Sequence, residues 1–291
     1  MVAEKRWRCI LGRDGTTGTA RAAGVVFLLL LVAIAAHAES PADQEWKTAF
    51  ASAKEQKRLV FVDYYATWCG PCKIMDAKVF SRDDVKEQLA NFVMLRIDVD
   101  RSKIARSRNV VAMPSYIVYD PGERELIRIT GAREPNVFRE AIAQVNGAKA
   151  GFIRASDLYA EGKELDGLFA SANAFLRLRM TDQARTAFRK ARKVAEGEGK
   201  ASAARVASIQ EAVTFSIDGN AKKSIKLLQQ IMQSPMDKET EAFAWLMLGD
   251  VEGSMPKEIE AARDAYQHVQ SIAPPDSSAY KHASEALSRL H

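Results

Sequence analysis

Short apolar runs alternate with segments of helical spacing in the first half of the chain. The apolar runs, each bounded by charged or turn-forming residues, predict four strands, at residues 59–65, 92–99, 115–120 and 125–130. Pro121-Gly122, a dipeptide typical of turns, separates the last two, so we expect them to form an antiparallel hairpin.

Helices are expected wherever apolar residues recur every three or four positions. Trp46, Phe50 and Ala53 show this spacing before the first strand. The expected helices are residues 41–57, the segment after Cys72, and residues 83–90, 101–108 and 135–144. Helices that alternate with strands and a hairpin in this order predict a central mixed sheet with helices on both faces, which is an α/β fold.

The strand pattern stops at Asn146-Gly147, which we interpret as a boundary between domains at residues 39–147 and 148–291. The later part is rich in Ala, Leu, Arg and Lys, with the spacing of paired helices. Its most regular unit contains Trp245, Leu248, Gly249, Ala262, Tyr266 and Pro274. This spacing resembles the tetratricopeptide repeat, in which small residues let paired helices approach and large ones fill the gap between them.

Two weaker units precede this one, at residues 168–191 and 221–228, and residues 276–290 are expected to be a capping helix. Glu252 stands where the repeat pattern has a tyrosine. The resemblance implies an all-α tetratricopeptide-like domain of three stacked units. An irregular helical bundle with the same apolar spacing remains the alternative.

Residues 68–72 read Trp-Cys-Gly-Pro-Cys and lie between a predicted strand and a predicted helix. Two thiols separated by two residues can close a small disulfide and open it again. The junction places Cys69 at a helix N-terminus, where unsatisfied N–H groups and the helix dipole stabilise a thiolate. The thiolate is the attacking species in disulfide exchange. The segment therefore predicts redox chemistry at Cys69 and Cys72.

This segment resembles the active site of the thioredoxin family. Asp63, six residues before Cys69, stands where thioredoxins have a buried carboxylate that helps move the proton of the second cysteine. Pro114 stands where the family has a cis-proline beside the disulfide, and Gly131 where it has a glycine between the last strand and the last helix. The resemblance covers residues 40–147 and implies the thioredoxin fold.

Some details differ from cytoplasmic thioredoxins. Met94 occupies the place of a lysine that many thioredoxins have near the buried carboxylate, and the segment after Cys72 lacks their kinking proline. Residues 65–68 and 79–81 are more similar to the periplasmic C-terminal domain of DsbD, a bacterial transmembrane disulfide reductase.

The resemblance implies a role for each site residue. Cys69 would be the nucleophile and Cys72 the resolving thiol. Asp63 would shuttle a proton, Pro114 would leave backbone groups free to pair with an extended substrate, and Trp68 would shield the disulfide. The alternatives are an ordinary edge-strand Asp63, a plain strand-start Pro114 and a packing role for Trp68.

Metal and haem sites are poorly supported by the cysteine pattern. A structural zinc site would need two more ligands, and the sequence has no second cysteine pair or Cys/His cluster. Haem attachment would need a histidine at position 73, which is lysine. We expect no cofactor and no metal.

Residues 1–38 have the order of a secretory signal peptide. Basic side chains come first, an apolar run at residues 22–36 follows, and Ala36-His37-Ala38 fits a cleavage site. The run of about 15 residues is short for a membrane span of roughly 20. We expect cleavage after Ala38, and the alternative is an uncleaved inner-membrane anchor. Cleavage would also remove Cys9 and leave only the active-site pair.

Most of the net charge of +5 belongs to residues 1–38, which removes most of the case for nucleic-acid binding. A basic run at residues 185–193 predicts a solvated helix face, and the alternative is a surface for an acidic partner.

The sequence favours an exported thiol–disulfide oxidoreductase of the periplasm or cell envelope. Gly-Pro between the cysteines resembles the reducing members of the family, so we expect reduction of client disulfides. Electrons would come from a membrane donor of the DsbD type, and the helical domain would bind client or partner proteins. The alternatives are an oxidase or isomerase that uses the same residues, and a helical scaffold with a non-catalytic thioredoxin module.

Overall fold

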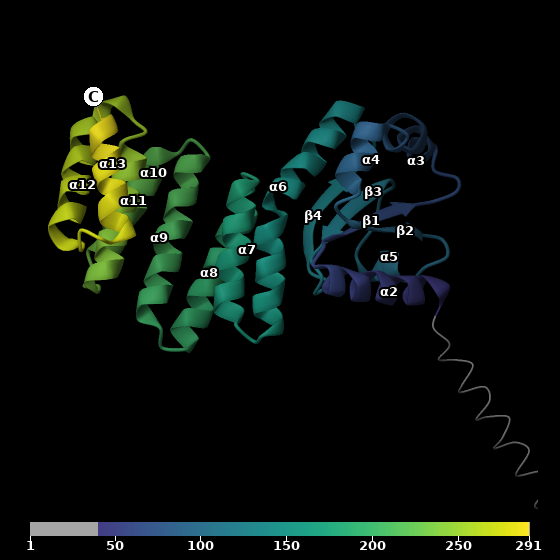
Figure 1. The fold of residues 1–291 in the computed structure, drawn as a ribbon, viewed down its shortest axis with the longest axis horizontal. Helices are drawn as coiled ribbons and strands as arrows, with labels where there is room; N and C mark the ends of the chain where they lie inside the picture. The colour runs from purple at the N-terminus through teal and green to yellow at the C-terminus, as the bar shows by residue number, and fades with distance from the viewer. Residues whose placement is uncertain (1–39, 291) are drawn as a thin grey trace, which may run out of the picture.

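The computed structural model describes residues 40–290, and the predicted signal peptide lies outside this range (Figure 1). The first part of the chain contains α2 (Pro41–Gln56), β1 (Val60–Tyr65), α3 (Gly70–Met75), the π-helical turn η1 (Asp76–Phe80), α4 (Asp83–Leu89), β2 (Val93–Asp98), α5 (Ile104–Ser107), β3 (Ser115–Tyr119), β4 (Glu125–Thr130) and α6 (Pro135–Ala160).

The four strands form one mixed sheet in the order β2-β1-β3-β4. β1 is parallel to β2 and antiparallel to β3, and β3 and β4 form the antiparallel hairpin that the Pro121-Gly122 turn predicts. α2 covers one face of the sheet, and α4 and the first turns of α6 cover the other (Figure 1). The predicted α/β fold class is confirmed.

Cores on both faces of β1 hold the sheet between its helices. Phe61 is fully buried against Phe138 of α6, with ring centroids 6.2 Å apart. Val62 points to the other face, into the core that contains Trp46 of α2. Because β1 is buried on both faces, it reads as a continuous apolar run rather than an alternating one.

The predicted end of the last helix at residue 144 is wrong, because α6 continues through Gly147 to Ala160. Val145, Phe152 and Ala155 continue the buried face of the helix beyond the predicted end. A glycine inside a helix costs about 1 kcal/mol, whereas burying a phenylalanine side chain gains about 1.5–3 kcal/mol. The predicted domain boundary at residue 147 therefore falls within a continuous helix, and the division itself remains a prediction.

The rest of the chain is helical. It contains α7 (Glu164–Arg177), α8 (Thr181–Gly197), α9 (Ala201–Ile217), α10 (Ala221–Met232), α11 (Lys238–Glu252), the 3₁₀ turn η2 (Pro256–Glu258), α12 (Ile259–Ile272) and α13 (Ser278–Arg289). Each helix packs on the next, and the series extends away from the sheet to the C-terminus (Figure 1).

Small residues allow these helices to approach closely. A Cβ added to Gly249 of α11 would lie 2.8 Å from the Tyr266 ring of α12, so glycine is required at this crossing. In the earlier helices, Ala172, Ala184 and Phe188 share one buried cluster. This is the packing that the repeat spacing predicts, while the tetratricopeptide assignment itself stays a prediction.

The basic run on α8 is partly exposed, as the solvated-face prediction expects for Lys190 and Lys193, but its arginines also pair with acidic residues. Arg185 pairs with Asp218 at 2.6 Å, and Arg189 and Arg192 both reach Glu211 of α9, at 3.6 and 3.5 Å. These arginines therefore also join α8 to α9, a contact that the sequence analysis did not predict.

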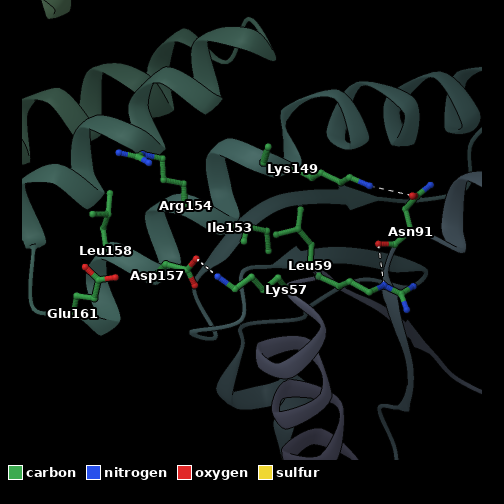
Figure 2. Close-up of a pocket in the computed structure, with 11 residues that line it drawn as sticks. Lys57, Leu59, Asn91, Lys149, Ile153, Arg154, Asp157, Leu158 and Glu161 are labelled. Carbon is green, nitrogen blue, oxygen red and sulfur yellow. Dashed lines mark hydrogen bonds and ion pairs between the residues drawn. The ribbon is translucent and has the colours of Figure 1, made fainter.

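Polar contacts join the second half of α6 to the segments beside the sheet, around a cavity of about 510 Å³ (Figure 2). Lys57 pairs with Asp157 of α6 at 3.1 Å, and Lys149 of α6 donates a hydrogen bond to Asn91 at 3.0 Å. Between residues 40 and 290, no helix combines the length and the apolar character needed to cross a bilayer.

Candidate active site

Cys69 and Cys72 form a disulfide at the start of α3, with their Cα atoms 5.3 Å apart. Cys69 is the N-cap residue of α3, and the backbone N–H of Cys72 donates to the Cys69 sulfur at 3.1 Å. When the disulfide opens, this N–H and the positive end of the helix dipole face the Cys69 sulfur. The geometry therefore stabilises a Cys69 thiolate.

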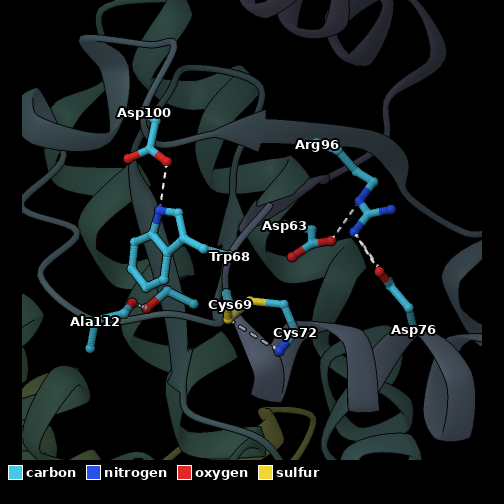
Figure 3. The surroundings of a disulfide bond; sticks show 9 residues. Asp63, Trp68, Cys69, Cys72, Asp76, Arg96, Asp100 and Ala112 are labelled. Carbon is cyan, nitrogen blue, oxygen red and sulfur yellow. Dashed lines mark hydrogen bonds and ion pairs between the residues drawn. A yellow bond between two sulfur atoms is a disulfide. The ribbon is translucent and has the colours of Figure 1, made fainter. Parts of the chain in front are cut away.

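The disulfide is almost completely covered, whereas the tryptophan before it is exposed. Cys69 and Cys72 are 3% and 4% exposed and pack with Ala66 and Met113. Trp68 is 64% exposed, and its indole N–H donates to Asp100 at 2.7 Å (Figure 3). Most of the Trp68 side chain is thus open to solvent, and its predicted role of shielding the disulfide stays a prediction.

A cis peptide bond joins Met113 to Pro114, where the family resemblance implies one. Met113 packs against the cysteine pair, which puts this loop beside the disulfide. The carbonyl of Pro114 accepts a hydrogen bond from the backbone N–H of Gly131 at 2.8 Å. Gly131 has a φ of 85°, a left-handed conformation that glycine adopts at little cost. The end of β4 thus holds the proline loop in place.

Asp63 is a buried carboxyl on β1, only 4% exposed. Its Oδ2 atom lies 2.8 Å from Nε of Arg96. Burial raises the pKa of Asp63 from its usual 3.8 to about 6, although the positive charge of Arg96 acts in the opposite direction. A carboxyl with a pKa near 6 can exchange a proton close to neutral pH.

Arg96 is a site residue that the sequence analysis missed. Parallel pairing of β1 and β2 places it opposite Asp63, and its guanidinium also reaches Asp76 at 3.1 Å (Figure 3). It lies 4.5 Å from the centre of the Tyr65 ring. Asp63 and Arg96 line a cavity of about 340 Å³. Met94, two residues before Arg96, lines this cavity too but brings no charge. The alternation of side chains along β2 was the available signal, because residues 94 and 96 share a face.

Replacing Asp63 with asparagine is expected to stabilise the protein at pH 8 but not at pH 4. The folded-state pKa lies above the unfolded value, so ionisation of Asp63 costs stability as the pH rises from about 4 to about 6. A shift of this size corresponds to about 3 kcal/mol. Urea unfolding of the oxidised protein at both pH values measures the difference. Asp83→Asn, at a 98% exposed side chain, is the control, and an equal pH dependence in both variants would contradict the assignment.

A disulfide at a helix N-terminus, with a buried carboxyl and a cis-proline loop near it, is the arrangement of a thioredoxin-like thiol–disulfide oxidoreductase. Comparison with known proteins agrees. The thioredoxin family model matches residues 39–144. Thioredoxin-1 of Saccharomyces cerevisiae is 37% identical over 102 residues, which are 34% of this chain and 94% of the yeast protein.

Two other relatives extend the comparison. A thioredoxin H-type from Fagopyrum esculentum is 33% identical over 98 residues, 33% of this chain and 81% of that protein. The thiol:disulfide interchange protein DsbD of Pseudomonas fluorescens is 37% identical over 118 residues, 38% of this chain and 20% of that longer protein. The chain belongs to the thioredoxin family, and Cys69 and Cys72 occupy its active-site position.

Proposed function

We propose that this thiol–disulfide oxidoreductase is exported and reduces disulfides of client proteins in the cell envelope. The observation that carries the proposal is the Cys69–Cys72 pair, held at the start of α3 beside the Pro114 loop and the buried Asp63. Gly70-Pro71 between the cysteines supports the reducing direction, because it resembles the reducing members of the family.

Reduction would pass through a mixed disulfide. The Cys69 thiolate attacks one sulfur of the client disulfide, whose S–S bond breaks, and the other client sulfur leaves as a thiolate that takes a proton. Cys72 then attacks the Cys69 sulfur, which releases the second client thiol and forms the Cys69–Cys72 disulfide. Two electrons have then passed from the cysteine pair to the client.

Asp63 would act in the second half of this sequence. Cys72 must lose its proton before it attacks, and a carboxylate with a pKa of about 6 is ionised at neutral pH. Among the described residues, the Asp63 carboxyl pairs with Arg96 and not with Cys72. A water molecule would therefore carry the proton from Cys72 to Asp63. In this role Arg96 is a positioning residue that keeps the carboxylate oriented.

The disulfide form must be reduced again by a donor outside the chain. We propose a membrane thiol donor of the DsbD type, supported by the similarity to the DsbD of Pseudomonas fluorescens. The helical region from α7 to α13 would bind client or partner proteins, since stacked helical pairs form extended binding surfaces.

The equilibrium reduction potential of the Cys69–Cys72 pair tests the reducing direction. The chain from Glu39 onward is titrated against glutathione and dithiothreitol, and the reduced fraction is measured by alkylation of free thiols. We expect a value near that of thioredoxin, roughly −270 mV. A value close to that of the oxidant DsbA, roughly −120 mV, would show that the protein oxidises or reshuffles disulfides instead.

Export is supported by the basic, apolar and small-residue order of residues 1–38. When the full chain is expressed in a Gram-negative bacterium, we expect it in the periplasmic fraction with Glu39 as its first residue. Sequencing of the N-terminus after cell fractionation measures both. Recovery of the intact chain from the cytoplasm would contradict export, and recovery from the inner membrane would support the anchor alternative.

A further inference from the structure

A buried carboxylate without a partner lies at the end of α11. Glu252 is 5% exposed, and within residues 40–290 its side chain has no hydrogen bond and no ion pair. Most buried carboxyl groups in folded proteins have a partner. The oxygens of Glu252 are instead accessible from the cavity that the side chain lines. The predicted repeat pattern has a tyrosine at this position, so the glutamate is a departure from that pattern.

Glu252 lines a cavity of about 550 Å³ formed by α10, α11 and α12. Asp264 lines the same cavity, which adds a second acidic group. Burial, together with the negative charges of Glu258 and Asp264, raises the pKa of Glu252 to about 7. None of the described residues that line this cavity is a lysine or an arginine, so two carboxyl groups face it without a fixed positive charge.

Two aromatic side chains, Trp245 and His268, also line this cavity. Their rings are 4.4 Å apart. Nε2 of His268 is buried and has no hydrogen-bond partner among the described residues, and the nearest acidic atom, on Glu241, is 3.6 Å away. Exposed amide side chains of Gln229 and Gln233 complete the lining on the α10 side.

We propose that this cavity binds an arginine side chain of a partner polypeptide. A guanidinium group pairs with a carboxylate through two parallel hydrogen bonds and also stacks on aromatic rings. Glu252 supplies the carboxylate, Trp245 the ring, and Asp264 a further negative charge. Arginine is favoured over lysine because a guanidinium is more weakly hydrated and enters a buried site at lower cost. The glutamines of α10 can accept and donate hydrogen bonds to the backbone beside the arginine.

This inference concerns a surface of the helical region and goes beyond the proposed disulfide reduction. It names the chemistry by which the helical region from α7 to α13 would bind a partner, and rests on that part of the proposed function. The two are tested separately, because Glu252 lies on α11 and the cysteine pair at the start of α3. A variant at Glu252 is therefore expected to keep the reduction potential of the Cys69–Cys72 pair, which is measured without any client protein.

The test uses acetyl-Gly-Arg-Gly-amide and the same peptide with citrulline, which has the shape of arginine without its charge. Nuclear magnetic resonance of the chain from Glu39 onward follows the indole N–H of Trp245 and the amides of α11 and α12. We expect saturable shifts with the arginine peptide only, and about tenfold weaker binding in Glu252→Gln. Glu239→Gln, an exposed position on the same helix, is the matched control and should bind normally.

Four results would overturn the proposal. Equal binding of the citrulline peptide would show that charge is not recognised. Unchanged affinity in Glu252→Gln, or no saturable shift at millimolar peptide, would show that the cavity does not hold the guanidinium. Tighter binding of free arginine than of the peptide would assign the site to a small molecule instead of a polypeptide.

Discussion

Replacing Cys69 with serine is expected to abolish disulfide reduction completely. The serine hydroxyl does not form an anion at neutral pH, so the first attack on a client disulfide does not occur. Reduction of insulin by dithiothreitol should fall to the rate measured without protein. Cys72→Ser should behave differently, because Cys69 can still attack while nothing resolves the mixed disulfide. That variant is expected to accumulate covalent complexes with client proteins, visible on a non-reducing gel.

The Cys69→Ser variant also distinguishes catalysis from a scaffold role. Cys69 is nearly buried, and serine is smaller and polar but of similar shape, so the fold and any binding surface of the helical region should persist. A cell in which the gene carries Cys69→Ser should therefore show the phenotype of a deletion. Normal function of that cell would contradict the enzymatic role and support a helical scaffold with a non-catalytic thioredoxin module.

The second large effect is expected on stability, from Phe152→Ala. Phe152 is fully buried on α6, and its ring lies 5.1 Å from that of Phe175 on α7. It belongs to the same core cluster as Phe138 and Phe61, which reach the sheet. Removing a buried phenylalanine ring costs about 3–5 kcal/mol, through lost burial and the cavity that remains.

Because this cluster is continuous from the sheet to α7, the loss should destabilise both parts of the chain. Hydrogen–deuterium exchange in increasing urea, read by mass spectrometry, measures the stability of the sheet strands and that of α8 to α13 as two separate signals. Val137→Ala on the same helix is the control, since Val137 is 55% exposed and a surface change is usually worth less than about 0.5 kcal/mol. A shift in only one of the two signals would show that α6 does not couple the sheet to the helices.

Local patterns were sufficient for the architecture of the sheet. The strand before Cys69 reads as an apolar run because β1 is buried on both faces, and the hairpin follows from its turn dipeptide. The end of α6 was not predictable in this way. A glycine inside an amphipathic segment usually suggests a boundary, but at Gly147 the burial of Phe152 further along outweighs the local cost.

The same division applies to the active site. The spacing of Cys69 and Cys72, with the family resemblance, was enough to locate the redox pair, Asp63 and Pro114. Arg96 was missed because its importance depends on strand register, which brings together two residues that are far apart in the chain. Glu252 was noticed only as a departure from the repeat pattern, since its burial depends on three helices that meet around it.

The sequence by itself determined the redox pair, the mixed sheet and the helical character of the second half, because each depends on residues that are neighbours in the chain. Tertiary structure decided the partner of Asp63, the length of α6 and the acidic cavity around Glu252. These features arise where distant segments pack together, and there burial and charge pairing across the fold set the energies.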